Sequence, residues 1–336
     1  MPVITFDQAK EFLEDINSED KVAIICHNDG DGFSSGILYH DWCKSKNAQV
    51  KAFIYTIRES KLKEFDLEKF NKIIVTDLSP GFMATEFELI KEKQILYTDH
   101  HPRVTPIPEE ILELVTADKG YLPSSRTAGE LTGLKPWLSL IGTITDSAEY
   151  YPENQEFITK HLKQLGITFD EFKQNISSVV TNFLVYFDND YDKAFEILKG
   201  INSIEEISQL KGYSDQVEDE VQKFVEEYKT KKEKLGHINF YYFEPHFKVK
   251  APVCAIISQR NNNEIYIFAA PINDNKHITL SARSNSKEKD MTELLRAGTQ
   301  GLEDSSSGGH APAAGGTIQA KDLEKFKQNI RNFVKQ

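Results

Sequence analysis

Three apolar segments of the sequence have the pattern of buried strands, and each ends in acidic or histidine side chains. The segments are residues 21–27, 72–76 and 95–98. Pro102 prevents the third from continuing, because proline cannot donate to a strand ladder. The polar residues at or just beyond the three ends are His27, Asp29, Asp31, Asp77, Asp99, His100 and His101. One such end would say little, whereas three in one chain strongly constrain the fold.

Helical patterns separate these strands, which indicates an α/β fold. Further strands are expected at 49–56 and 114–118, and helices at 5–16, 33–45, 62–70 and 82–93. Strands that alternate with helices form a mostly parallel sheet with helices on both faces. The carboxyl ends of parallel strands lie along one edge, where ligands bind in open α/β sheets. The acids and histidines are therefore expected to converge there.

After residue 125 the pattern becomes helical, and Asp146 lies inside an expected helix over residues 137–150. From there this acid could join the others. We predict three parts in the chain, namely an N-terminal domain over 1–200, a highly charged helical connector over 201–235 and a smaller α/β domain over 236–336.

The last domain combines short apolar runs with a serine- and glycine-rich stretch. Strands are expected at 252–258, 264–270 and 278–282, and helices at 291–297 and 323–333. Residues 304–316 lie inside this domain rather than between domains. We therefore interpret them as a loop that contacts a ligand.

Carboxylates gathered at one sheet edge would repel each other and raise their pKa values. Divalent cations resolve this conflict, and mixed carboxylate and imidazole ligands suit Mn²⁺, with Mg²⁺, Co²⁺ or Zn²⁺ as alternatives. The donors suffice for two ions, which together can activate a water and stabilise a phosphoryl group. Taken singly, each acid could instead cap a helix or occupy a turn. Their joint occurrence favours the metal site.

Composition narrows the class of protein. The 336 residues are 39% hydrophobic and 27% charged, with a net charge of -12. That charge argues against broad attraction to duplex DNA, although Arg103, Arg126, Arg283 and Arg296 could hold phosphates locally. Three distant cysteines argue against a disulfide framework or a zinc–thiolate site. Without a signal peptide or an apolar run of membrane-spanning length, we expect a cytoplasmic protein.

These motifs resemble a known family. Residues 27–32 (His-Asn-Asp-Gly-Asp-Gly), Asp77, residues 99–101 (Asp-His-His) and Asp146 resemble the four motifs of the DHH phosphoesterases. Residues 281–283 and 308–315 resemble the associated C-terminal DHHA1 domain. The match spans most of the chain in the family's order. It is most similar to RecJ-like and oligoribonuclease-like members, particularly archaeal-type ones.

The resemblance implies a role for each matching residue. The implied metal ligands are His27 and Asp29 for one ion, Asp31, His100 and Asp146 for the other, and Asp77 as a bridge between them. His101 would contact the scissile phosphate, and Asp99 would orient the histidines. The implied substrate-binding residues of the second domain are Arg283, Gly308, Gly309 and His310.

The resemblance implies a Mn²⁺-dependent phosphodiesterase or exonuclease that shortens short RNA or single-stranded DNA by a two-metal mechanism, with substrate in the cleft between the domains. The acidic chain favours short substrates, because long ones gain from an extended basic track. One alternative is a phosphodiesterase or phosphatase acting on a cyclic dinucleotide or 3′-phosphoadenosine 5′-phosphate. Another is an inactive scaffold that binds nucleic acid or replication proteins. Polarity, the physiological metal, and assembly as a homodimer or with a DNA-repair or replication partner stay open.

Overall fold

The computed structural model describes residues 4–57, 60–83, 86–102, 107–116, 121–259, 264–272, 276–284 and 290–335. Contacts divide the chain into two compact units, residues 1–214 and 215–336. Among the described residues, no helix combines the length and apolar character needed to cross a membrane. All three cysteines are buried free thiols.

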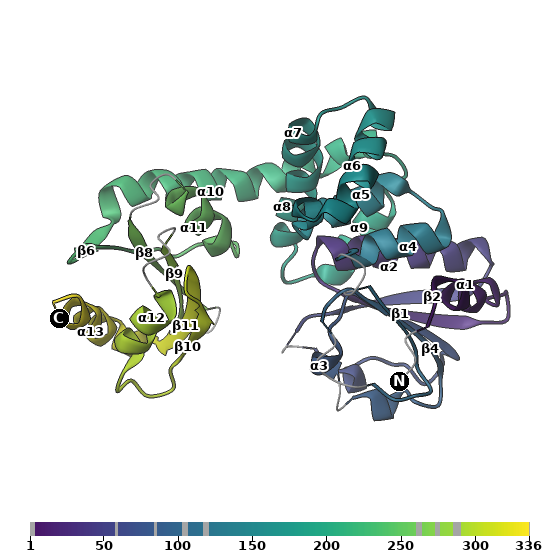
Figure 1. The fold of residues 1–336 in the computed structure, drawn as a ribbon, viewed down its shortest axis with the longest axis horizontal. Helices are drawn as coiled ribbons and strands as arrows, with labels where there is room; N and C mark the ends of the chain where they lie inside the picture. Colours follow the sequence, from purple (N-terminus) through teal and green to yellow (C-terminus); the bar gives the residue numbers. More distant parts are fainter. Residues whose placement is uncertain are drawn as a thin grey trace. The chain divides into compact units, whose positions relative to one another are not determined.

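The first unit is built on a five-stranded sheet whose strands are all parallel, which confirms the predicted α/β fold (Figure 1). In spatial order the strands are β2 (Gln49–Tyr55), β1 (Lys21–His27), β3 (Lys72–Thr76), β4 (Gln94–Asp99) and β5 (Leu112–Val115). Because β2 and β3 lie on opposite sides of β1, the strand order reverses there. Ligands of open α/β sheets bind at the carboxyl ends of strands beside such a reversal.

Helices pack on one face of this sheet. In β3, Ile74 points into the larger core of the unit, whereas Ile73 and Val75 point into the smaller one, as strand alternation requires. The helices that contribute to the larger core include α1 (Phe6–Glu14), α2 (Gly30–Ser45), α4 (Ser124–Thr132) and α5 (Pro136–Thr145).

The opposite face differs from the prediction of two helices over 62–70 and 82–93. Among the residues described there, the structure has only short turns, namely η1 (Leu62–Glu64), α3 (Pro80–Met83) and η2 (Phe87–Leu89). Leu67 and Phe70 still enter the smaller core, but tight backbone turns between residues 65 and 70 position them. The spacing of these apolar residues therefore predicted correctly that they enter the core, but not the backbone structure that places them there.

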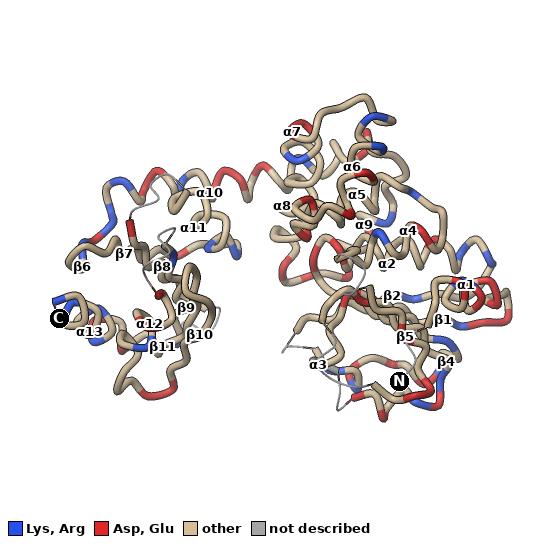
Figure 2. The backbone as a smooth tube through the Cα atoms, in the orientation of Figure 1, with Lys and Arg blue, Asp and Glu red and all other residues tan. Residues whose placement is uncertain are grey.

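Further helices among the described residues of the first unit are η4 (Ala148–Tyr150), α6 (Pro152–Leu165), α7 (Phe169–Phe172), the π-helical turn η5 (Lys173–Ser177), α8 (Ser178–Tyr186), α9 (Tyr191–Lys199) and η6 (Ile204–Leu210). The long helix α10 (Lys211–Lys231) confirms the helix expected within 201–235. Acidic and basic residues are interspersed along it (Figure 2). The domain boundaries at 200 and 235 stay a prediction.

The second unit contains a six-stranded mixed sheet. In spatial order its strands are β10 (Ser306–His310), β11 (Ala313–Gln319), β9 (His277–Ser284), β8 (Ile265–Pro271), β7 (Ile238–Tyr242) and β6 (Glu233–Leu235). Only the pair β7–β8 is parallel among these described strands. The helices α12 (Met291–Thr299) and α13 (Leu323–Val334) pack on its apolar core.

Two predictions for this unit were wrong. Residues 252–258 form most of the helix α11 (Lys250–Ser258) instead of a strand. Val253, Cys254 and Ile257 are its buried apolar residues, and their spacing of three and four suits one face of a helix. The stretch 304–316 holds the antiparallel hairpin β10–β11 rather than a loop, because its small residues fit the edge of the sheet.

Candidate metal centre

The carboxyl ends of β1, β3 and β4 bring the predicted acids and histidines together. His27 is the last residue of β1, Asp99 is the last of β4, and Asp77 follows β3 directly. Since β3 pairs with both β1 and β4, the three ends are neighbours along one edge of the sheet. The convergence predicted from the strand pattern is therefore present.

Residues 30–32 of the first motif form the start of α2. Asp29 is the N-cap of this helix, and its Oδ1 accepts a hydrogen bond from the backbone N–H of Gly32 at 2.9 Å. Asp31 lies in the first helical turn and is 1% exposed. A Cβ at Gly32 would collide with the His27 carbonyl oxygen, so this close approach requires glycine.

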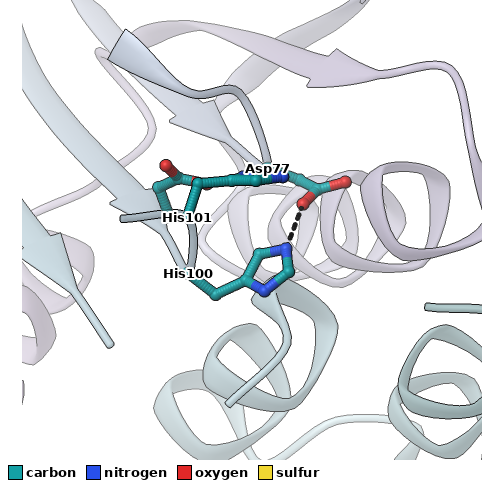
Figure 3. Close-up of side chains that lie close together, drawn as sticks. Asp77, His100 and His101 are labelled. Atoms are coloured by element: carbon teal, nitrogen blue, oxygen red, sulfur yellow. Dashed lines mark hydrogen bonds and ion pairs between the residues drawn. The ribbon is translucent and has the colours of Figure 1, made fainter. Parts of the chain in front are cut away.

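Asp77 lies at the centre of the cluster in an unfavourable backbone conformation. Its φ of 60° is left-handed, which is rare for residues other than glycine and is tolerated where surrounding structure enforces it. Oδ1 lies 3.1 Å from His100 Nε2, the ion pair drawn in Figure 3, and Oδ2 lies 3.6 Å from His27 Nδ1. Asp77 thus contacts histidines from two different strand ends.

Ligand atoms group around three overlapping sets of side chains. The sets are His27, Asp29 and Asp77; Asp31, His100 and Asp146; and Asp77, Asp99, His100 and His101. Within each set the candidate ligand atoms lie within 4.8 Å of one another. The first two sets have the membership that the resemblance implies for two separate ions, and Asp77 and His100 each belong to two sets.

The N-terminus of α4 holds Asp31 in place. The backbone N–H groups of Ser124 and Ser125 donate to its two carboxylate oxygens at 2.7 and 3.0 Å. The hydroxyl of Ser124 also donates to Asp77 Oδ1 at 3.3 Å. Two serines absent from the sequence-based site thus position two predicted ligands. Serine at the start of a helix usually indicates a helix cap, so the sequence gave no reason to expect a contact with the distant Asp31.

Asp146 ends a helix instead of lying inside one. It is the C-cap of α5, and its Oδ2 is 3.7 Å from His100 Nδ1. Packing between α4 and α5 is tight near this end. A Cβ at Gly142 would collide with the Ser125 hydroxyl and would lie 2.8 Å from Asp31 Oδ1. The position of the ligands therefore depends on a residue without a side chain.

Asp99 and His101 form a pair beside the cluster. Asp99 Oδ1 lies 2.8 Å from His101 Nδ1, within hydrogen-bonding distance. The Asp99 side chain is fully buried, whereas 40% of the His101 side chain is exposed. A buried carboxylate fixes the orientation of an imidazole that solvent and ligands can reach. His100, 1% exposed, faces Asp77, Asp31 and Asp146 instead.

Crowding of acids perturbs their protonation. Burial and the charges of Asp29 and Asp31 raise the pKa of Asp77 well above its usual range. Burial and the charge of Asp31 raise the pKa of Asp146 to about 6. Burial opposes the charged form of His27, but its contacts with Asp29 and Asp77 outweigh burial and raise its pKa to about 10. The metal-free cluster therefore retains protons that a bound cation would replace.

The residues fit divalent cations. Several buried ligand atoms of the cluster make no hydrogen bond among the described residues, although the ring nitrogens lie within ion-pair distance of neighbouring carboxylates. They are His27 Nδ1, Asp77 Oδ2, Asp99 Oδ2, both ring nitrogens of His100, and Asp146 Oδ2. Buried polar atoms without partners are costly, and native structures usually satisfy them with protein, water or ions. Oxygen and imidazole donors in this number suit Mn²⁺, Mg²⁺ or Co²⁺.

The predicted substrate-binding residues lie in the second unit. Arg283 of β9 pairs with Ala313 of β11, which pairs with His310 of β10. Residues directly opposite each other in a sheet share a face, so Arg283 and His310 project from the same face roughly 10 Å apart, two strand spacings. Gly309 has a φ of 134°, and a Cβ there would collide with the backbone of β11. The hairpin thus brings the predicted residues together.

The other candidate arginines are arranged differently. Arg126 donates to the Glu153 carbonyl and the Asn154 side chain, both at 2.7 Å, and pairs with Glu130. It is therefore committed to protein contacts. Arg296 is exposed on α12. Arg103, like Asp118 at the expected end of a strand, lies outside the described residues.

Two family models match the chain. Residues 21–181 match the model of the DHH family, N-terminal domain, and residues 238–336 match the model of the DHHA1 domain. No curated protein sequence matches the chain.

Solved structures show the same fold. Exonuclease RecJ bound to manganese is 17% identical, with a TM-score of 0.73 over 99% of this chain and 95% of that one. RecJ from Thermus thermophilus in complex with Mn²⁺ is 19% identical, with a TM-score of 0.70 over 99% of this chain and 55% of that one. A pGpG-specific phosphodiesterase from Vibrio cholerae is 16% identical, with a TM-score of 0.50 over 94% and 99%.

Proposed function

Because the chain belongs to the DHH family and also carries the DHHA1 domain, we propose that it is a metal-dependent phosphodiesterase that removes nucleotides from short RNA or single-stranded DNA. The observation that carries the proposal is the pair of ligand sets, His27–Asp29–Asp77 and Asp31–His100–Asp146, at adjoining strand ends. Two such sets within one cluster suit a reaction that uses two cations on one phosphate.

Each residue of the centre has a task in this proposal. Two divalent cations, with Mn²⁺ the first choice, would lower the pKa of the attacking water and offset the negative charge of the phosphoryl group. Asp77 would be a ligand of both ions, which is supported by its contacts with both His27 and His100. His101 contacts the scissile phosphate, supported by its exposure and by the buried Asp99 that orients it. No side chain is required as the sole general base.

The preference for short substrates is supported by charge and by the second unit. A chain with a net charge of -12 offers little attraction to a long phosphate backbone. Arg283, His310 and the backbone of Gly308 and Gly309 would bind one phosphate or terminal nucleotide. Recognition of one end favours an exonuclease over cleavage at internal positions.

The test compares products from end-labelled RNA and DNA. We expect the full chain with Mn²⁺ to release mononucleotides from oligomers of about two to five units faster than from a long single strand. Chelator and Asp77→Ala provide the inactive controls. Absence of cleavage of every oligomer with Mn²⁺, Mg²⁺ or Co²⁺ would contradict the proposal. Activity that survives in Asp77→Ala would remove the bridging role of that residue.

A second candidate uses the same centre on a small nucleotide. It is supported by the likeness in fold to the pGpG-specific phosphodiesterase, although that likeness extends to the fold alone. Linear dinucleotides, cyclic dinucleotides and 3′-phosphoadenosine 5′-phosphate in the same assay separate the two. Faster hydrolysis of the last two than of any linear oligomer would favour this candidate.

A further inference from the structure

A ladder of aromatic rings leads from the metal centre to solvent. The ring of Tyr121 meets His100 edge-on, with 4.7 Å between ring centroids. Tyr151 stacks on Tyr121 with centroids 4.4 Å apart and ring planes within 15°. His100 is 1% exposed, whereas Tyr151 is 41% exposed. The ladder therefore begins at a predicted metal ligand and ends in an open aromatic surface.

Hydrogen bonds around the buried side chain of Asn154 fix the backbone of both tyrosines. The Asn154 amide donates to the carbonyls of Tyr121 at 3.1 Å and Ala148 at 2.9 Å. The backbone N–H of Tyr151 donates to Ala148 as well, and Arg126 holds the Asn154 oxygen. Tyr121 has a left-handed φ of 55°. A bulky residue keeps this conformation only where its surroundings enforce it, so the ladder is preorganised.

A rigid, solvent-facing aromatic surface beside a phosphoryl-transfer site has one obvious chemical use. Every nucleobase presents a flat π-face, and single-stranded nucleic acid is commonly bound by stacking bases on aromatic side chains. Tyrosine suits this task because it offers a large contact area while losing little conformational entropy. Phosphate esters without a base would gain nothing from such a surface.

We infer that Tyr151, backed by Tyr121, stacks a nucleobase of the substrate next to the phosphate that is cleaved. The inference rests on the proposed function and deepens it, since it makes the metal centre selective for nucleoside phosphodiesters. Selection would act in the first unit itself, close to the chemistry, and would tolerate different bases because stacking does not read their hydrogen-bonding edges.

The test compares Tyr151→Ala with the wild type on two matched oligomers, one with all bases and one with an abasic residue next to the cleaved bond. We expect wild type to prefer the base-bearing oligomer. The variant should lose roughly five- to 150-fold in kcat/KM on that oligomer and should cut the two oligomers at similar rates. Tyr151→Phe, which keeps the ring, should restore most of the preference, whereas Tyr151→Leu, which keeps apolar bulk, should not.

Tyr150→Ala is the matched control, because Tyr150 precedes Tyr151 directly and is 77% exposed, and the ring contacts of Tyr121 are made with His100 and Tyr151. The thermal shift on adding Mn²⁺ reports separately that each variant folds and binds metal. An unchanged preference in Tyr151→Ala and Tyr151→Leu, with wild type active, would overturn the inference alone. A wild type inactive on every oligomer would overturn the proposed function instead.

Discussion

The metal centre of the first unit and the β10–β11 hairpin of the second are built in opposite ways. Asp77 and His100 are 2% and 1% exposed and are surrounded by other acids and histidines. Every residue of β10 is exposed, and the hairpin presents small residues together with His310. Deep burial fixes geometry and raises the cost of any charge change, whereas an open surface tolerates variation. We therefore expect the chemistry to depend on the first region, and binding of the substrate's terminal phosphate to depend on the second.

The largest effect should come from Asp77→Asn, which keeps the shape of the side chain but removes its charge. Loss of a shared ligand forfeits several kcal/mol of charge stabilisation. At 1.36 kcal/mol per tenfold, this corresponds to a fall of roughly 10³-fold or more in kcat. The thermal shift on adding Mn²⁺ should shrink as well. A variant that kept both activity and thermal shift would show that the two regions do not divide the work in this way.

A smaller effect, of a different kind, is expected from Arg283→Ala. Removing a charged hydrogen bond to a phosphate costs about 1.5–3 kcal/mol, which corresponds to roughly ten- to 150-fold in kcat/KM. The thermal shift with Mn²⁺ should stay at the wild-type size, because Arg283 belongs to the other unit. Arg331→Ala, which removes an arginine of the same unit that pairs with Glu233 at 3.9 Å, is the control. A loss of metal binding in Arg283→Ala would contradict the assignment of metal binding to the first unit and phosphate binding to the second.

The stabilisation of the protein by metal should also depend on pH. In the metal-free protein Asp146 and His27 have raised pKa values of about 6 and about 10. The stability contributed by protonated Asp146 is complete below the pKa that this residue has in the unfolded chain, and it is lost as pH rises through about 6. The stability contributed by protonated His27 is complete below its pKa in the unfolded chain, and it is lost as pH rises through about 10.

Metal binding requires the deprotonated forms of both groups, so the stability that bound metal adds increases as pH rises. The difference in melting temperature with and without Mn²⁺ should therefore widen as pH rises from about 5 to about 8. Thermal unfolding across this range measures it. Asp146→Asn should flatten the trend, and a difference that narrowed with rising pH would contradict the assignment of these groups to the metal centre.

The smallest effect is expected from Ser124→Ala. Its hydroxyl donates to Asp77 at 3.3 Å, whereas its backbone N–H, which holds Asp31, is unaffected by the change. Loss of one such hydrogen bond costs about 0.5–1.5 kcal/mol, so Mn²⁺ affinity should fall by roughly two- to tenfold. Isothermal titration measures this, with Ser178→Ala on the exposed side of α8 as a control. An effect as large as that of Asp77→Asn would be inconsistent with a supporting role.

Much of the first sheet could be predicted, because parallel strands buried on both faces are continuous apolar runs. Lys21–His27 and Lys72–Thr76 have the bounds that this pattern indicates. The convergence of Asp77 and Asp99 followed from strand direction alone. The short turns at 62–70 and 82–93 could not be recognised, since their apolar residues enter the core from irregular backbone.

Residues that support the site were harder to find because their contacts are made across the fold. Ser124 and Ser125 are more than ninety residues from Asp31, and only the packing of α4 against α2 brings them together. The left-handed backbone of Asp77 likewise has no local signal. In the second unit, the run 252–258 is short and mostly apolar, so its helical spacing becomes clear only once the buried positions are known from the tertiary packing.

The missing side chain at Gly142 has a consequence for how this protein can vary over evolution. A single methyl group there would push against Ser125 and the carboxylate of Asp31. Such a change alters no charge, contacts no substrate and would pass for a mild helix-favouring replacement. Its cost would nevertheless fall on the reaction itself. The positions under selection for chemistry thus extend beyond the ligands, into glycines that matter because of the space they leave.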